Sequence, residues 1–335
     1  MDKRALILGA TGAMATYLVP KLLSEGYAVD GVCLDGSSSD GERFTLLNHD
    51  AKDKAFLSEL LKNGYDTIVD FMLYPTVEEF SEYADLLLPA TRRYIFLSTY
   101  RVYAWEYPQR EDSLRLIDAK LPDNFVYDRE YSIYKAAEED WLRSSDYKNY
   151  SIIRPAITFS KRRFQLTTLE ADVLIHRMKQ GKTVLLPEGA RNVQATMSWA
   201  GDVAKMIYAV ITSDEAEGET YTVSTSEHHT WEEVAEMYRR IGGLSYAFIP
   251  DEDYLTVIAN GGVAARQQLN YDRKLNRVVD NSKILALMNE TSDDLMPLED
   301  GLRMEYERLD PSTIPHKRTV CDAMDEYIAS HGIRV

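Results

Sequence analysis

The sequence predicts an α/β fold in which a doubly wound parallel sheet carries helices on both faces. The first observation is an apolar run at 5–8 that leads through a glycine turn into a helical pattern over 17–23. The second is the alternation of strand-like and helix-like segments through the first half of the chain. The third is the segment 93–98, whose apolar character is typical of a strand that is buried on both faces.

The individual elements follow in order along the chain. The expected strands are residues 5–8, 28–34, 44–50, 65–71, 93–98 and 152–155. The expected helices are residues 17–23, 53–63 and 77–88, followed by a helix that carries Tyr131 and Lys135. Further on, Asp202 is expected to be a helix N-cap, and Thr230 with Glu233 forms a capping-box pattern. The alternation stops in the second half, so we expect a first domain at 1–155 and a smaller lobe at 156–335, from which some segments return to the first domain.

The glycine turn at the start of the chain predicts a nucleotide site. Its sequence is Gly9-Ala10-Thr11-Gly12-Ala13-Met14, placed between the first strand and the first helix. Glycines allow the backbone to approach a pyrophosphate closely, and the helix N-terminus presents amide groups to it. We therefore expect Gly9, Thr11, Gly12, Ala13 and Met14 to contact a dinucleotide.

The end of the second expected strand favours NAD over NADP. Asp35 lies there, 26 residues after Gly9, and is followed by Gly36 and three serines rather than by Arg or Lys. A carboxylate at this point accepts hydrogen bonds from the ribose hydroxyls of the adenosine and repels a 2′-phosphate. The alternative is an ordinary aspartate in a turn.

Composition excludes several other classes of protein. A net charge of −16 opposes general binding of nucleic acid. The six histidines are scattered and form no metal-binding pattern, so no metal is expected. The two cysteines, Cys33 and Cys321, fit a reducing compartment. No apolar run approaches the roughly 18 residues of a membrane span, and the fold begins so early that a signal peptide is not expected. These features predict a cytoplasmic enzyme that acts on a small molecule.

Candidate catalytic groups lie at 98–104 and at 131–135. Tyr131 and Lys135 are four residues apart and therefore share one face of a helix. An ammonium group beside a phenol stabilises the phenolate and lowers the tyrosine pKa from its usual value of about 10. Tyr131 would then remove or return a hydroxyl proton. A hydroxyl at the end of the fifth strand, from Thr99 or the neighbouring Ser98, would donate a hydrogen bond to the reacting oxygen.

These motifs together resemble the extended short-chain dehydrogenase/reductase superfamily, in its NAD-dependent epimerase/dehydratase branch. The glycine turn, the Ser98–Ala104 segment, the Tyr131–Lys135 spacing and Arg154-Pro155 carry the resemblance. It implies a Rossmann-type fold with a smaller C-terminal substrate lobe. It also implies that Lys135 holds the nicotinamide ribose, that Pro155 lies near the nicotinamide, and that Asp50 contacts the adenine. Counted back from Val102 and Tyr103, the family motif assigns the hydroxyl role to Thr99.

The resemblance extends into the second half of the chain. There it implies that Arg191 contacts the substrate and that Arg273 pairs with a nucleotide diphosphate, for which a guanidinium is suited because it donates two parallel hydrogen bonds. The alternative for Arg273 is an ordinary surface arginine. Relatives of this kind also commonly form dimers, so a homodimer is possible.

One departure from the family pattern narrows the reaction. Dehydratases that resemble this family carry Asp-Glu directly after the threonine, where this chain has Tyr100-Arg101. The preferred function is therefore a nucleoside-diphosphate-sugar epimerase that acts at C4. The alternatives are a dehydrogenase or reductase of a sugar or other small alcohol, and a catalytically idle NAD-binding scaffold that binds RNA or protein. The loops 105–130 and 159–169 would select the substrate.

Overall fold

A computed structural model describes residues 3–36, 38–161, 163–259 and 261–333. Within these residues the main sheet has eight strands in the order β12-β7-β6-β5-β1-β2-β4-β3, and all neighbours are parallel except β3 and β4. Its strands are β1 (Arg4–Leu8), β2 (Ala28–Cys33), β3 (Ser39–Asp40), β4 (Phe44–Asn48), β5 (Tyr65–Asp70), β6 (Thr91–Leu97), β7 (Tyr150–Ile153) and β12 (Thr220–Tyr221). This order, with β1 at the centre, confirms the predicted doubly wound sheet.

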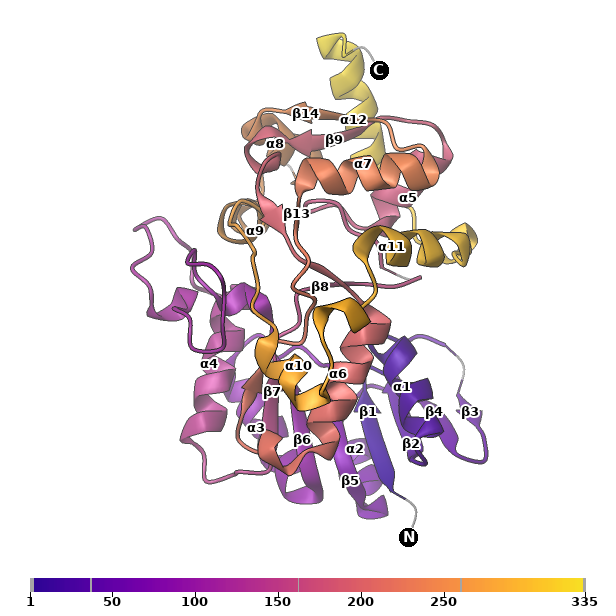
Figure 1. Cartoon of the computed structure of the whole chain (residues 1–335), viewed down its shortest axis with the longest axis vertical. Coiled ribbons are helices and arrows are strands. Elements are labelled where there is room, and N and C mark those ends of the chain that lie inside the picture. The colour runs from indigo at the N-terminus through magenta and orange to yellow at the C-terminus, as the bar shows by residue number, and fades with distance from the viewer. Residues whose placement is uncertain (1–2, 37, 162, 260, 334–335) are drawn as a thin grey trace.

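Helices cover both faces of this sheet, as Figure 1 shows. They are α1 (Ala15–Ser24), α2 (Lys54–Leu60), α3 (Val77–Leu87), α4 (Tyr131–Ser144), α6 (Ala200–Thr212) and α10 (Ser282–Met288). Successive residues of a strand point to opposite faces. Ala5 and Ile7 of β1 accordingly pack with α1, α6 and α10, whereas Leu6 and Leu8 pack with α2, α3 and α4. Burial on both sides explains the unbroken apolar runs at 5–8 in β1 and at 94–97 in β6.

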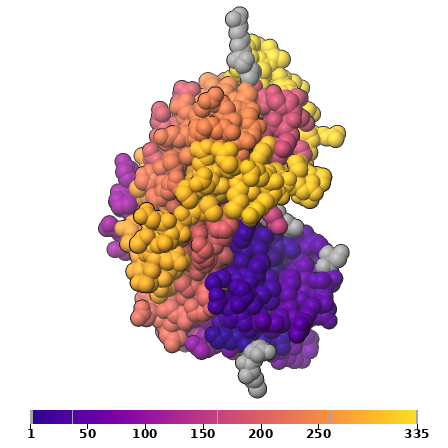
Figure 2. All heavy atoms as spheres, turned by 45° about the vertical axis from the view of Figure 1, so that its right-hand side comes forward, coloured from indigo at the N-terminus to yellow at the C-terminus, as the bar shows by residue number. Residues whose placement is uncertain are grey.

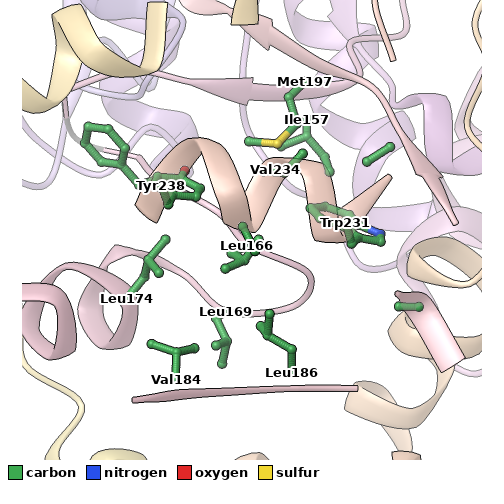
Figure 3. Packing of buried hydrophobic residues seen from close by; sticks show 14 of the residues in the cluster. Ile157, Leu166, Leu169, Leu174, Val184, Leu186, Met197, Trp231, Val234 and Tyr238 are labelled. Atoms are coloured by element: carbon green, nitrogen blue, oxygen red, sulfur yellow. The ribbon is translucent and has the colours of Figure 1, made fainter. Parts of the chain in front are cut away.

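The second lobe contains the remaining helices and three short sheets. Its helices are α5 (Ala171–Lys179), α7 (Trp231–Gly242), α8 (Asp251–Ala259), α9 (Val263–Gln268), α11 (Leu298–Glu307) and α12 (Arg318–His331). Its strands are β8 (Ile157–Phe159), β9 (Val184–Pro187), β10 (Gln194–Ala195), β11 (Met197–Trp199), β13 (His229–Thr230) and β14 (Tyr246–Ile249). Figure 3 shows Trp231, Val234 and Tyr238 of α7 packed in this lobe's core, near Leu166 and Leu174.

The division between the two lobes does not coincide with the two halves of the chain. In Figure 2 the N-terminal segments fill the lower right, whereas the second half fills the upper part and also reaches the lower left. The expected boundary near residue 155 is soft, because α6 and β12 from the second half cover and extend the main sheet. No helix in the described part of the chain is long and apolar enough to cross a membrane.

The predicted elements of the first half agree with the structure to within a few residues, and the capping box of Thr230 and Glu233 is confirmed. The prediction for Asp202 is wrong. Strand β11 runs directly into α6, so Trp199 is the N-cap and Asp202 lies within the first helical turn. Its carboxylate accepts a hydrogen bond of 2.6 Å from the Met296 amide. Ser37 and Arg162, which belong to loops discussed above, lie outside the described residues.

Candidate active site

Two adjoining cavities lie at the carboxyl ends of the central strands. The first has a volume of about 330 Å³ and the second about 370 Å³. Met14, Phe71 and Leu97 line both, so together the cavities form one continuous cleft. Ligands of open α/β sheets bind at this edge, where the strand order reverses beside β1.

The first cavity is built on the glycine turn. Of the predicted dinucleotide contacts, Gly9, Thr11, Gly12, Ala13 and Met14 all line it. Gly9 has a φ of +86°, and a Cβ there would lie 3.2 Å from the Cβ of Phe71. The turn is tied to β2 because the amides of Gly9 and Ala10 both donate to the Val32 carbonyl. Glycine therefore meets both a conformational and a steric requirement at the floor of this cavity.

The carboxylate at the end of β2 also lies in the first cavity. Asp35 lines it and accepts a hydrogen bond from the Thr11 hydroxyl. This contact joins the second strand to the glycine turn. Asp50 follows β4 and is exposed, and its carboxylate accepts a hydrogen bond of 2.8 Å from the Lys52 amide. Its neighbours His49 and Ala51 line the first cavity, but Asp50 does not.

The second cavity brings together three of the predicted reaction residues and Pro155. It is lined by Met14, Phe71, Leu73, Leu97, Ser98, Thr99, Tyr100, Arg101, Tyr131, Pro155, Ala156, Ile157, Thr158, Arg163, Gln165, Glu170, Gln268 and Arg273. Thr99 comes from the end of β6 and Tyr131 from the start of α4, so a strand end and a helix start meet here.

The two hydroxyl candidates at the end of β6 have different surroundings. Ser98 is fully buried and donates to Glu139 Oε1 at 2.6 Å. That carboxylate forms a two-point ion pair with Arg154, at 2.8 and 2.6 Å. Burial opposes the charge of Glu139, but Arg154, Arg143 and Ser98 outweigh it and hold the pKa of Glu139 below its usual value. The Thr99 hydroxyl instead accepts a hydrogen bond of 3.2 Å from the Arg101 amide, which leaves its own proton to donate.

Tyr131 is partly buried and lies beside a cation that sequence reasoning did not assign. The guanidinium carbon of Arg101 lies 5.1 Å from the centre of the Tyr131 ring. Arg101 is held by Glu130 Oε1 at 3.2 Å and by Asp272 Oδ2 at 3.4 Å. A cation over an aromatic face is attracted by the ring, so Arg101 fixes the position of the Tyr131 ring.

Lys135 lies deeper than the resemblance implied. Its side chain is fully buried, and its Nζ lies 3.0 Å from Glu138 Oε2 and 3.5 Å from the carbonyl oxygen of Met72. Met72 lines the first cavity, but Lys135 lines neither cavity. The ammonium group therefore lies directly beneath the cavity wall.

The two arginines that were predicted to contact the substrate have different positions. Arg273 is 3% exposed and lines the second cavity. It donates to the Thr167 carbonyl at 2.7 Å and pairs with Asp272, so it is not a surface arginine. Arg191 lines neither cavity; it pairs with Glu188 at 3.0 Å and packs on the ring of Phe248.

Sequence reasoning missed several residues of the cleft. Phe71, Met72 and Leu73 follow β5 directly. The rule that ligands bind at the carboxyl ends of parallel strands would have identified them. No sequence signal identified Gln268, which lies more than 130 residues beyond Tyr131 and reaches the cleft only through the fold.

Comparison with known proteins gives one family and one fold. A model of the NAD dependent epimerase/dehydratase family matches residues 5–224. Among curated proteins, none matches this sequence.

Solved structures of three epimerases resemble this chain over more than nine tenths of its length. An epimerase from Methanothermobacter thermautotrophicus has a TM-score of 0.69 at 15% identity, covering 92% of this chain and 93% of its own. The UDP-glucuronic acid 4-epimerase of Bacillus cereus has a TM-score of 0.65 at 18% identity, covering 91% and 98%. The UDP-glucose 4-epimerase of Thermotoga maritima has a TM-score of 0.67 at 17% identity, covering 91% and 97%. At these identities the likeness shows the fold, which confirms the predicted Rossmann-type architecture.

Proposed function

Because the chain belongs to the NAD dependent epimerase/dehydratase family, we propose that it is a nucleoside-diphosphate-sugar epimerase that acts at C4. One observation carries the proposal. Thr99 and Tyr131 line a single cavity that is continuous with the cavity over the glycine turn. A reacting hydroxyl between these two side chains would therefore lie next to the end of a dinucleotide held by the turn.

The first cavity fits NAD, the cofactor for which the family is named. Gly9 carries no side chain, and its φ and the nearby Phe71 both disfavour one, so a pyrophosphate can approach the backbone of the turn closely. Gly12 and Ala13 precede α1, and Asp35 lines the same cavity after β2, where it would accept hydrogen bonds from the adenosine ribose. NAD bound there supplies the hydride acceptor that oxidation at C4 requires.

The chain's own residues would move the proton. Tyr131 removes the proton of the C4 hydroxyl and later returns one to the same oxygen. Thr99 donates its hydroxyl hydrogen to that oxygen, since its lone pair already accepts from the Arg101 amide. Lys135, one helical turn from Tyr131, favours the phenolate.

An epimerase must also allow the keto sugar to rotate within the cavity, so that its other face meets the cofactor. We propose Arg273 as a diphosphate anchor, because it lines the second cavity and its guanidinium is fixed by Thr167 and Asp272. Anchoring by the diphosphate holds the intermediate and leaves the hexose free to present either face. Arg191 stays a prediction, supported by the resemblance alone.

The alternatives differ in what happens to the reduced cofactor. A dehydrogenase or reductase would use the same Thr99 and Tyr131 but release NADH. The similar structures named above include two 4-epimerases of UDP-sugars, which favours the epimerase. An idle scaffold that binds RNA or protein is disfavoured by the joint placement of Thr99 and Tyr131 in one cavity and by the net charge of −16.

The test is a panel of UDP-, GDP-, dTDP- and CDP-sugars, incubated with the purified protein without added NAD. We expect inversion at C4 by NMR with no accumulation of NADH. Stoichiometric release of NADH would make the protein a dehydrogenase. No reaction with any sugar of the panel would contradict the proposed substrate class.

The catalytic assignment has its own test. Tyr131→Phe removes only the oxygen that transfers the proton, so turnover should fall by at least about 100-fold while the affinity for NAD is retained. The matched control is Tyr147→Phe, a tyrosine of the loop after α4 that lines neither cavity. Retention of most of the rate by Tyr131→Phe would refute the acid/base assignment.

A further inference from the structure

A fully buried ion pair on α4 lies beneath the cleft. Lys135 and Glu138 are both 0% exposed, and their Nζ and Oε2 atoms are 3.0 Å apart. Neither carboxylate oxygen of Glu138 accepts a well-formed hydrogen bond from the described residues. An anion that is removed from water with a single cationic partner and no further hydrogen-bond donor is poorly stabilised.

Asp70, a carboxylate that also acts on Glu138, has quite different surroundings. It accepts hydrogen bonds from the hydroxyls of Tyr74 at 3.0 Å and Tyr94 at 2.7 Å. The Met72 amide adds a third at 2.9 Å. The carboxylate of Asp70 therefore has three hydrogen-bond donors, whereas among the described residues Glu138 has only the ammonium group of Lys135.

The surroundings of Glu138 contain few other charges. Lys135 and Glu139 face it from its own helix, and Asp70 faces it from the end of β5. Tyr74 and Tyr94 also face it, from the loop after β5 and from β6, and Tyr134 faces it from α4. The adjacent helix α3 contributes the apolar Phe80, which packs on Trp141.

We propose that Glu138 is a positioning residue that controls the acid/base chemistry of Tyr131 through the charge of Lys135. When Glu138 is protonated, the ammonium charge of Lys135 acts in full on the Tyr131 phenol. When Glu138 is ionised, it offsets that charge and the phenolate loses stabilisation. The proposal rests on the proposed role of Tyr131.

The ionisation of Glu138 falls in the working range of such an enzyme. Burial raises its pKa from its usual value to about 7, against the opposing effect of Lys135. Seven residues of α4 separate Tyr131 from Glu138, or about 10 Å along the helix. A unit charge at that distance in a protein shifts a pKa by roughly half to one unit.

The test is the pH dependence of turnover in Glu138→Gln, which preserves the shape of the side chain and removes its charge. The limb on which the rate rises with pH should move to lower pH by about half to one unit, because Lys135 is no longer neutralised. The control is Asp140→Asn, which removes a carboxylate of the same helix that pairs instead with Arg115 at 2.7 Å. Its pH profile should match that of the wild type.

A second measurement follows Glu138 itself and needs no substrate. The infrared band of a protonated carboxyl group, present in the wild type and absent from Glu138→Gln, should disappear as the pH rises through about 7. The proposal would be overturned if Glu138 were already ionised at about pH 5. It would also be overturned if the pH dependence of turnover were the same in Glu138→Gln as in the wild type. The infrared titration tests Glu138 without any activity measurement. The proposed role of Tyr131 is tested separately, because an active Tyr131→Phe variant would refute it.

Discussion

At the scale of single residues, Asp35 is proposed to decide between the two nicotinamide cofactors. Its carboxylate lines the first cavity and accepts from the Thr11 hydroxyl. A 2′-phosphate at that point would face a negative charge, so we expect NAD to bind at least about tenfold more tightly than NADP, which is about 1.4 kcal/mol. Asp35→Ala should narrow this difference in titrations with both cofactors. Equal affinities in the wild type would disprove the role of Asp35.

The two hydroxyl candidates show what sequence alone leaves open. Ser98 and Thr99 are adjacent, and the motif favoured Thr99 only by its spacing from Val102 and Tyr103. The hydrogen bond of Ser98 to Glu139 supports the same choice on physical grounds, because it ties the serine into the buried pair with Arg154. A partner that lies 41 residues away cannot be identified from local spacing.

At the scale of elements, the sequence predicted what local patterns determine. The strands β1, β2, β4, β5 and β6 are apolar runs between helical patterns, and their positions are confirmed. The pairs β10–β13 and β11–β8 were not predicted. They contain two or three residues per strand, so they carry no period of their own and depend on the tertiary partner. Asp202 failed as an N-cap for a similar reason, since β11 and α6 are joined without a loop.

The packing of β2 against the glycine turn gives an element-scale prediction. A Cβ on Gly31 would lie 2.6 Å from the Cβ of Ala10, which is too close for both to keep their positions. Gly31→Ala should therefore displace the turn, weaken NAD binding several-fold and cost about 1–3 kcal/mol of stability. Calorimetric titration with NAD and urea denaturation measure the two effects.

A second glycine distinguishes displacement of the turn from general loss of stability. Gly243 ends α7 with a φ of +71° and has open space around the position of a Cβ. Gly243→Ala should cost about 1 kcal/mol through backbone strain and leave NAD affinity unchanged. If both variants bind NAD as the wild type does, β2 does not set the position of the turn.

At the scale of the whole molecule, the site combines segments that the sequence keeps far apart. Asp272 is fully buried among Arg101, Arg273 and Arg277. Burial opposes its charge, but the three arginines hold its pKa below the usual value. Arg101 lies 171 residues before Asp272, so this ion-pair cluster could not be predicted. The sequence predicted Arg273 as a diphosphate contact, but it did not predict Asp272, the carboxylate that fixes this arginine.

A histidine links β13 to α11 across the second lobe and makes stability depend on pH. His229 lies 2.7 Å from Glu227 Oε1, while Glu227 Oε2 accepts from the Leu298 amide at the start of α11. The hydrogen bond to Glu227 raises the pKa of His229 above its usual value despite partial burial. A raised histidine pKa means that the folded protein binds the proton more tightly than the unfolded chain. The resulting stabilisation is complete below about pH 6.5 and is lost as the pH rises through the raised value.

His229→Gln should therefore destabilise the protein most under mildly acidic conditions. Because both side chains are partly exposed, solvent screening limits the effect to about 0.5–1 kcal/mol at about pH 5.5, and less should remain at about pH 9. Urea denaturation of both proteins at the two pH values measures the difference. Glu227 is ionised at both pH values, because the hydrogen bond with His229 holds the pKa of Glu227 below its usual value. An equal loss at both pH values would mean that His229 acts through packing and not through its charge.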